Sequence, residues 1–296
     1  AYVNRYAVRP GRRAVVFPNT DGGYGAALDL KAAGVGIAAV VDARPAPAGP
    51  LTARAQAEGL RVFAGSAVVG VQGGKRVTGV RVARLSDDGK TVAGTPEAID
   101  CDLVANSGGW NPTVHLFCQA KGKLRWDDEH ACFVPEAAMQ AGQRSAGAAN
   151  GSFGLGSCLA EGKEAGAEAA AACGFTPSGN EASQADNRDF LPGRWLWLVP
   201  GEQPLGRKAK HFVDQQNDVT AADLKLALRE GYRSIEHVKR YTTTGMATDQ
   251  GKMGNVNAIG IVADAIGKPL PEVGVTTFRP PYTPVTFGAF AGRDVD

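Results

Sequence analysis

The sequence predicts an α/β fold followed by a small helical domain, and three observations lead to this prediction. Between residues 14 and 42, an apolar run, a glycine-rich turn, an alanine-rich stretch and a second apolar run follow one another. Residues 60–82, and again residues 93–101, alternate between apolar and polar side chains, as the strands of a β-meander do. After residue 212, capping residues precede stretches with helical periodicity.

Composition excludes several classes of protein. The 296 residues include 32 lysines and arginines against 30 acids, so the net charge is +2 and no basic block indicates a nucleic-acid partner. The five cysteines are widely spaced and form no CxxC pair, which favours reduced thiols over a zinc site. The sequence contains neither a membrane-spanning run nor a signal core, which predicts a cytoplasmic protein with no membrane partner.

The first segment predicts a parallel βαβ crossover. Residues 14–17 and 37–41 are short apolar runs that suit strands, and residues 24–33 between them are rich in helix formers. Gly34 follows where a helix is expected to end. The order of strand, glycine-rich turn, helix and strand is typical of a dinucleotide-binding unit.

Two features of this unit bear on what it could bind. The turn Asn19-Thr20-Asp21-Gly22-Gly23 departs from the GxGxxG pattern that lets a pyrophosphate approach the backbone. Asp42 lies about 20 residues further on, where a carboxylate would bind the ribose hydroxyls of NAD. Arg44 could accommodate a 2′-phosphate instead. A nucleotide fold whose pocket is empty or degenerate is the alternative.

Two further glycine-rich turns are candidate cofactor contacts. Residues 101–107 predict a buried strand that ends in Gly108 and Gly109, where the backbone could approach a cofactor closely. Residues 147–162 run from a loop into a helix, so that N–H groups near Gly147 and Asn150 could face a pyrophosphate. Close packing of helix on strand would explain these glycines equally well.

A polar loop is the most distinctive stretch, reading HVKRYTTTGMATDQGKMGNVN over residues 237–257. It lies between helices that Ser234 and Asn255 are predicted to cap, and the helix before them begins with a capping box of Thr220 and Asp223. The pattern helix–GMxxxQG–helix matches the outline of a small domain that holds a [2Fe–2S] cluster in several dehydrogenases. The cluster ligands would fall at Asp214, Gln216, Asp249 and Gly254. None of these is a thiolate, so the sequence predicts no metal site.

No residue is assigned to catalysis. The sequence has no GxSxG elbow, HExxH pair or P-loop, and its four histidines are dispersed without a metal-ligand spacing.

Four stretches carry a resemblance to a known family. They are VVDARP at 40–45, DLVANSGGWNPTVHL at 102–116, HVKRYTTTGMATDQGKMGNVNAIGIVADAIGKPLPEVG at 237–274 and TTFRPPYTPVTFGAFAGR at 276–293. Over nearly its whole length the sequence resembles the alpha subunit of bacterial heterotetrameric sarcosine oxidase. The resemblance implies a central fragment, with a nucleotide-binding half before it and a folate-binding domain after it.

The resemblance also implies a domain plan. Residues 1–174 would form a Rossmann region that binds two dinucleotides, as in thioredoxin reductase, with the βαβ unit 14–42 inserted and residues 102–173 returning. The rest would comprise a linker over 175–211, an all-helical domain at the flavin interface over 212–275, and the start of a junction to an aminomethyltransferase-like domain over 276–296.

The resemblance implies cofactors and partners as well. In that family, an FAD in the beta subunit oxidises sarcosine, an FMN between alpha and beta receives the electrons, and oxygen becomes hydrogen peroxide. Tetrahydrofolate in the alpha subunit accepts the one-carbon unit, and the alpha subunit also carries NAD. Beta, gamma and delta subunits would be the partners.

By position, the candidates for the alpha side of the FMN site are Thr242, Thr243, Thr244, Gln250 and Lys252. The NAD could lie in the βαβ unit, or in the upstream half completed by the glycine turns at 108–109 and 147–151. Two other interpretations stay open: an alpha subunit of a dye-linked amine or imino-acid dehydrogenase, and a non-catalytic adaptor that joins flavin subunits to a folate domain.

Overall fold

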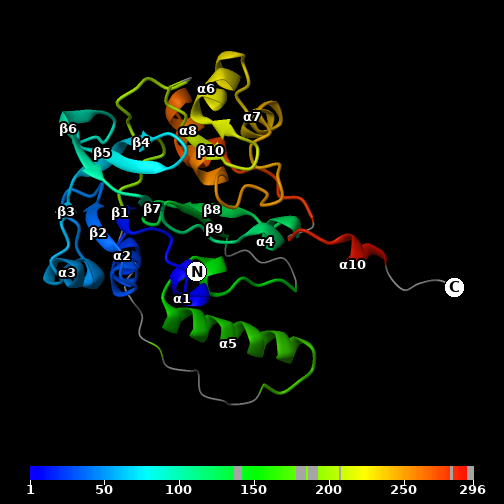
Figure 1. Ribbon diagram of the computed structural model, residues 1–296. Helices are drawn as coiled ribbons and strands as arrows, with labels where there is room; N and C mark the ends of the chain where they lie inside the picture. Colours follow the sequence, from blue (N-terminus) through cyan, green and yellow to red (C-terminus); the bar gives the residue numbers. More distant parts are fainter. Residues whose placement is uncertain (137–141, 178–184, 186–192, 207, 281–282, 292–296) are drawn as a thin grey trace. The chain divides into compact units, whose positions relative to one another are not determined.

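The computed structural model describes residues 1–136, 142–177, 185, 193–206, 208–280 and 283–291. The chain divides into two compact units. Unit 1 comprises Ala1–Trp110 and Asp189–Ala209, and unit 2 comprises Asn111–Arg188 and Lys210–Asp296. Each is described by itself below (Figure 1).

The parallel sheet of unit 1 confirms the predicted βαβ crossover. Its strands lie in the order β3-β2-β1-β7, and all neighbouring pairs are parallel. The bounds are β1 Arg13–Pro18, β2 Gly36–Val41, β3 Val62–Phe63 and β7 Leu103–Ser107. Helix α2 (Gly22–Ala32) connects β1 to β2, and Gly34 follows it with a positive φ of 81°, as a helix stop requires.

An antiparallel β-meander covers one face of this sheet, and helices cover the other. The meander consists of β4 (Ser66–Gly73), β5 (Val77–Leu85) and β6 (Val92–Asp100). Successive residues of β1 point to opposite faces. Val16 therefore packs with α2 and with α3 (Pro50–Ala57), whereas Val15 packs with Val80 and Val82 of the meander. Helix α1 (Tyr2–Tyr6) precedes β1 and buries no residue.

Part of the predicted linker 175–211 belongs to unit 1. Leu196 and Val199 pack on a cluster that contains Ala43 and Leu85, and Arg194 donates to the carbonyl oxygen of Ala43 at 3.1 Å. These apolar contacts explain why the predicted boundary at residue 174 differs from the division of the structure. Residues 178–184, 186–192 and 207 of the predicted linker lie outside the described residues.

Unit 2 is mainly helical in its second half, but that half is not all-helical. It opens with the antiparallel pair β10 (Phe212–Asp214) and β11 (Val219–Thr220), followed by α6 (Ala221–Arg229), α7 (Ile235–Thr242), α8 (Asn255–Ile266), α9 (Leu270–Val273) and α10 (Phe287–Ala291). The first half contains α4 (His115–Gln119), β8 (Leu124–Asp127), β9 (Cys132–Pro135), the 3₁₀ turn η1 (Gly147–Asn150) and α5 (Leu155–Ala172). Residues 281–282 and 292–296 of the predicted junction lie outside the described residues.

The N-caps of three helices in unit 2 can be compared with the capping residues that the sequence predicts. Thr220 and Asp223 form the predicted capping box of α6. Ser234 is the N-cap of α7, although its side chain makes no capping hydrogen bond. The predicted cap of α8 is wrong: Gly254 is the N-cap, and Asn255 is the first helical residue. Its amide is buried and donates to Thr276 Oγ1 instead.

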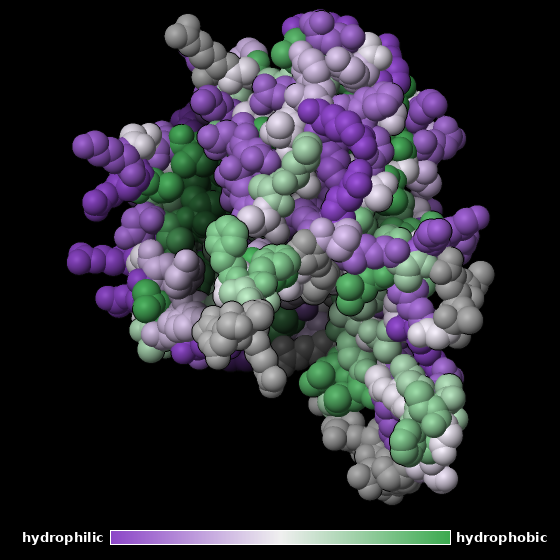
Figure 2. Space-filling model, turned by 90° about the vertical axis from the view of Figure 1, so that its right-hand side faces the viewer, coloured by the Kyte–Doolittle hydropathy of each residue, from purple (hydrophilic) through white to green (hydrophobic). Residues whose placement is uncertain are grey.

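Hydrophilic and hydrophobic side chains share the face drawn in Figure 2. In the described part of the chain, no helix combines the length and the apolar composition that crossing a bilayer would need.

Candidate functional site

The turn after β1 retains one of the three glycines of a dinucleotide fingerprint. A Cβ on Gly23 would overlap the Cβ of Pro18 and lie 3.3 Å from the Cβ of Ser107. Gly23 therefore fills the role of the third glycine, which allows the helix to pack closely on the strands. With Gly23 in that position, the spacing places Pro18 and Thr20 where the first two glycines would stand. The feature that gives a pyrophosphate access to the backbone is therefore missing.

Side chains of unit 1 fill this turn. The carboxylate of Asp21 accepts from the backbone N–H groups of Leu51 at 3.1 Å and Thr52 at 2.9 Å, so it caps the start of α3 and presents negative charge where a pyrophosphate would lie. Asn19 donates to the carbonyl oxygen of Gly108 at 2.8 Å. Asn19 Oδ1 and Thr20 Oγ1 are buried with no hydrogen-bond partner in the part of the chain that the structure describes.

The glycine pair after β7 is where the sequence predicts it; the space beside Gly108 is open, but Gly109 is covered. Trp195 lies over Gly109, because a Cβ there would be 3.2 Å from the ring atom Cζ3 of Trp195. The close approach of a ligand to this backbone would require the indole to move.

Asp42 stands at the carboxyl end of β2, as predicted, but its carboxylate has internal partners. It is fully buried, with 0% of its surface exposed. Arg44 donates to it from its backbone N at 2.8 Å and from Nη2 at 2.7 Å, and the Tyr24 hydroxyl donates at 2.9 Å. Burial, and then the charge of Asp42, raise the pKa of Tyr24 above its usual value, so the hydroxyl stays a donor. The accessible carboxylate that ribose binding requires is absent.

Arg44 is therefore also bound within the chain. Its guanidinium pairs with Asp42 in a buried ion pair, which is costly to open because each charge would lose its partner away from water. The predicted contact of Arg44 with a 2′-phosphate is not supported by this geometry.

The predicted anion site at Gly147 and Asn150 is occupied by an acid of the chain itself. Glu161 of α5 accepts from the backbone N–H of Gly147 at 2.8 Å, from Asn150 at 3.3 Å and from the Ser152 hydroxyl. Burial opposes ionisation of Glu161, but these hydrogen bonds outweigh it and hold its pKa below the usual value. The carboxylate of Glu161 thus takes the place that a pyrophosphate would need.

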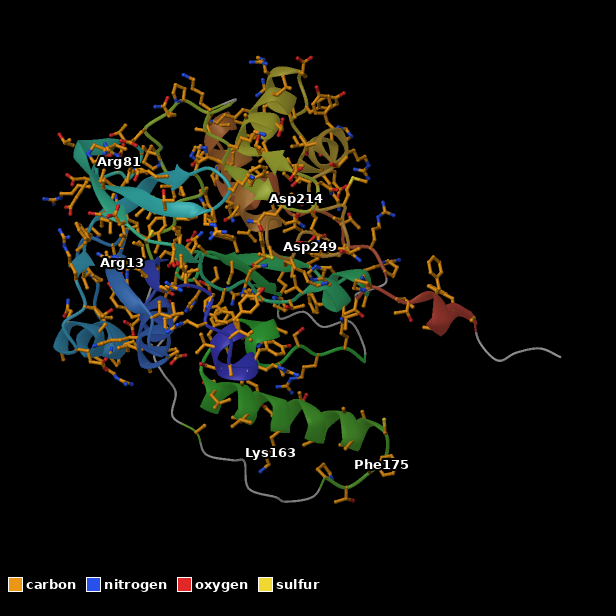
Figure 3. The ribbon with its side chains drawn as sticks, in the orientation of Figure 1. Arg13, Arg81, Lys163, Phe175, Asp214 and Asp249 are labelled. Atoms are coloured by element: carbon orange, nitrogen blue, oxygen red, sulfur yellow. The ribbon has the colours of Figure 1, made fainter. Side chains whose placement is uncertain are left out.

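Hydrogen bonds connect three of the four positions where cluster ligands would fall, Asp214, Gln216 and Asp249, to one another or to the polar loop of unit 2. Asp214 accepts from the backbone N–H groups of Gln216 at 2.9 Å and of Gly245 at 2.8 Å, the second of which belongs to the polar loop. Gln216 Oε1 accepts from Thr248 and from the backbone of Asp249, both at 3.2 Å. Asp214 and Asp249 are labelled in Figure 3. The residues that the structure describes contain no group of three potential metal ligands.

Asn255 fixes the shape of the polar loop from inside. Gly245 and Gly251 both have positive φ, at 67° and 72°, and a Cβ on either would overlap Asn255 Oδ1. The Asn255 amide donates to the Gln250 carbonyl oxygen at 3.3 Å. Because L side chains rarely adopt this φ and no room exists for one, the loop needs glycine at both positions.

The outer side of this loop lines a cavity of about 460 Å³. Its lining residues are Glu236, Lys239, Arg240, Gly245, Met246, Ala247, Thr248, Gln250, Arg279 and Pro284. They come from α7, from the polar loop and from the segment after α9. With three cations and one carboxylate, the lining suits an anionic ligand.

The five residues predicted for the FMN site do not lie together. Gln250 lines the cavity. Thr242 lines a second hollow of about 310 Å³, and Thr243 is the left-handed cap of α7. Thr244 is 1% exposed.

Lys252 lies apart from the cavity. It lines a small cavity of about 20 Å³ beside His115, whose ring stacks on Phe278 with centroids 3.9 Å apart. Burial, followed by the charge of Lys252, lowers the pKa of His115 to about 4.

The sequence analysis missed the cationic residues of the cavity. Lys239 and Arg240 occupy the last turn of α7, where basic residues are common because they offset the helix dipole. Arg279 lies in the turn-rich FRPPY stretch, about 40 residues later. The sequence shows a slight excess of basic over acidic residues in the whole chain. It does not show that the segment containing Arg279 folds back to line a cavity with α7.

Comparisons with known proteins identify a matching domain family and relatives of the chain. Residues 208–293 match the family described as the sarcosine oxidase A3 domain. The chain is 43% identical to the sarcosine oxidase subunit alpha of Rhizobium meliloti (strain 1021), over 99% of this chain and 28% of that protein. It is 42% identical to the corresponding subunit of Corynebacterium sp. (strain P-1), over 99% of this chain and 30% of that protein.

Among solved structures, the crystal structure of L-proline dehydrogenase from P. horikoshii is similar in fold. The TM-score is 0.66 at 19% identity, and the alignment covers 97% of this chain and 51% of that chain. The likeness confirms the predicted α/β fold. The chain is homologous to sarcosine oxidase alpha subunits along 99% of its length, and it spans 28–30% of the length of those relatives.

Proposed function

We propose that the chain acts as a cofactor-binding and assembly part of a sarcosine oxidase alpha subunit. The whole enzyme would convert sarcosine to glycine with oxygen and tetrahydrofolate, and would release hydrogen peroxide and 5,10-methylenetetrahydrofolate. The observation that carries the proposal is identity of 41–43% to named alpha subunits along 99% of the chain. Sarcosine itself would bind at the flavin of another subunit, as the resemblance to the family implies.

The cavity in unit 2 is the proposed alpha side of an FMN site shared with a beta subunit. Its volume, about 460 Å³, falls in the range of ligand pockets, roughly 300–1,000 Å³. Its lining combines cations from α7 and Arg279 with the amide of Gln250 and the backbone of the polar loop. When bound, FMN supplies a flavin that relays electrons toward oxygen.

The residues of the chain would bind and orient this group. Lys239 and Arg240 supply charge for its anionic part, while Asn255 and Asp214 hold the loop that forms one wall. This assignment changes the predicted residue set, since it retains Gln250 and leaves Thr242, Thr243, Thr244 and Lys252 outside the wall.

We do not extend the proposal to NAD in the βαβ unit. Asp42 is committed to Arg44 and Tyr24, and Asp21 presents a negative charge at the turn. The second predicted place for NAD, beside the glycine turn at Gly147, finds no support in this geometry either, because the Glu161 carboxylate accepts from the backbone N–H of Gly147.

The test is reconstitution of the enzyme with the remaining subunits and domains. Sarcosine-dependent peroxide and bound FMN are measured for the wild type, for Ala247→Trp in the cavity wall, and for the matched exposed control Ala53→Trp on α3. We expect the cavity variant to lose FMN and turnover while the control retains both. Peroxide production from sarcosine by the 296-residue chain alone would refute the proposal, and FMN retention by Ala247→Trp would refute the placement of the site.

A dye-linked dehydrogenase with an iron–sulfur cluster finds less support. The candidate ligand positions carry Asp214 and Gln216, which are tied to the polar loop by hydrogen bonds. An iron assay on the purified complex tests this alternative, and stoichiometric iron would favour it. The adaptor alternative predicts a complex in which Ala247→Trp leaves FMN content and turnover unchanged.

A further inference from the structure

We infer that Lys239, Arg240 and Arg279 form a recognition site for a phosphate monoester group at the cavity of unit 2. The inference rests on the proposed flavin function and deepens it, because it assigns the phosphate end of the ligand to named side chains. The three cations come from two segments that are far apart in sequence but line the same cavity.

The charge balance of the cavity calls for a dianion. Glu236 is the single acid among the lining residues that the structure describes, against three cations, which leaves an excess of about two positive charges. A phosphate monoester carries about −1.5 to −2 charges at neutral pH. A single carboxylate would leave one cation unmatched.

Glu236 cannot neutralise the whole group, because its carboxylate already has two partners. Arg240 Nη1 donates to it at 2.6 Å, and the backbone N–H of Thr277 donates to its other oxygen. Lys239 and Arg279 therefore lack a carboxylate of their own among the described lining residues.

Lys239 and Arg279 have donors available for a ligand. Lys239 Nζ donates to the carbonyl oxygen of Thr277 at 3.2 Å, which uses one of its three protons. The backbone of Arg279 donates to Gln250 Oε1 at 3.1 Å. Its exposed guanidinium has no hydrogen-bond or ion-pair partner among the residues that the structure describes.

The pKa of Lys239 reflects the neighbouring positive charges. Burial comes first among the causes that lower its pKa, and the charges of Arg240 and Arg279 add to it while Glu236 opposes it. A bound anion would relieve this repulsion. The helix dipole of α7 accounts for basic residues in its last turn, but it does not account for Arg279, which lies outside the helix.

Guanidinium groups suit phosphate because their planar donors engage two oxygens at once. The predicted recognition is therefore directed at the phosphate and independent of the ring it carries. Riboflavin, which has the same ring system as FMN without phosphate, separates the two contributions.

The test is calorimetric titration of the reconstituted complex, prepared without flavin, with FMN, riboflavin and inorganic phosphate. We expect FMN to bind at least about tenfold more tightly than riboflavin, as charge-assisted hydrogen bonds predict. Arg279→Met should lower that preference at least about fivefold without changing riboflavin affinity, and Arg279→Lys should restore part of it. Lys225→Met, which removes an exposed charge on α6 outside the cavity, is the matched control and should behave as wild type. Circular dichroism checks that each variant is folded.

The outcomes separate this inference from the proposed function. Equal affinities for FMN and riboflavin, or an unchanged preference in Arg279→Met, would overturn the inference and leave the flavin proposal standing. Inorganic phosphate binding that depends on Arg279, with no flavin binding, would support the inference and count against the flavin proposal. Binding of none of the three ligands to the folded complex would overturn the inference.

Discussion

Replacement of Asp214 by alanine tests whether hydrogen bonds hold the polar loop in place. The Asp214 carboxylate accepts from three backbone N–H groups, those of Gln216 at 2.9 Å, Asn217 at 3.0 Å and Gly245 at 2.8 Å. The side chain is 6% exposed, so water cannot fully replace it. Each buried donor left without a partner costs about 1–3 kcal/mol.

The expected loss of unfolding free energy is about 3 kcal/mol for Asp214→Ala, because Gln216 and Asn217 are exposed residues whose N–H groups would recover part of their solvation. Asp214→Asn should cost less, because the amide oxygen can still accept from Gln216 and Asn217. Its NH2 group would, however, face the N–H of Gly245. Urea denaturation followed by circular dichroism at 222 nm measures both changes. Asp218→Asn, at an exposed neighbouring carboxylate, is the control and should stay within about 0.5 kcal/mol of wild type.

A change below about 0.5 kcal/mol in Asp214→Ala would refute the reasoning, since it would mean that the loop N–H groups find other partners.

Three further predictions concern buried groups. Asp42→Asn should lower the unfolding free energy by about 3 kcal/mol, because it leaves the buried Arg44 without its counter-charge, and a loss below about 1 kcal/mol in urea denaturation would contradict this. His115 has a folded pKa of about 4 against 6.5 for the free side chain, so its contribution is fully present above pH 6.5 and is lost as the pH falls toward 4. His115→Leu should flatten the stability–pH curve in that window, and an unchanged slope would argue against it. Gly251→Ala should lower the unfolding free energy by about 2 kcal/mol in the wild type and by about 1 kcal/mol in an Asn255→Ala background. The difference arises because Asn255→Ala removes the overlap with the new Cβ but leaves the positive φ of residue 251. Equal losses in the two backgrounds of this double-mutant cycle would contradict a contribution from the overlap.

Local patterns predicted the elements that local physics decides. The apolar runs of the βαβ unit fall within β1 and β2, and Thr220 with Asp223 forms the predicted capping box. Both signals lie within a few residues of the structure they specify. Hydrophobic alternation likewise predicted a meander, which the structure forms from β4, β5 and β6.

The roles of side chains in those elements were harder to predict. A carboxylate at the end of β2 looks the same in sequence whether it faces a ribose or an internal arginine. The outcome depends on Tyr24, 18 residues earlier, and on the direction of the Arg44 side chain. Similarly, the polarity of Asn255 indicated a helix cap, whereas its amide fills the interior of a loop whose glycines leave room for it.

Long-range placement explains what the sequence analysis missed. Arg279 reaches the cavity because the chain after α9 returns toward α7, and no spacing within either segment specifies that return. The division into units has the same origin, since Leu196 and Val199 join unit 1 through apolar contacts far from them in sequence.

Hydrogen exchange of the chain with saturating FMN, and separately with saturating NAD, tests the central claim most directly. The claim is that ligand recognition lies at the cavity of unit 2, whereas the turn of the βαβ unit is closed by Asp21, Asp42 and Arg44. We predict that FMN protects the amides of residues 239–250 and of Arg279, and that neither ligand protects residues 19–23 or 42–44. Protection of the βαβ turn by NAD, with no protection at the cavity by FMN, would contradict the account.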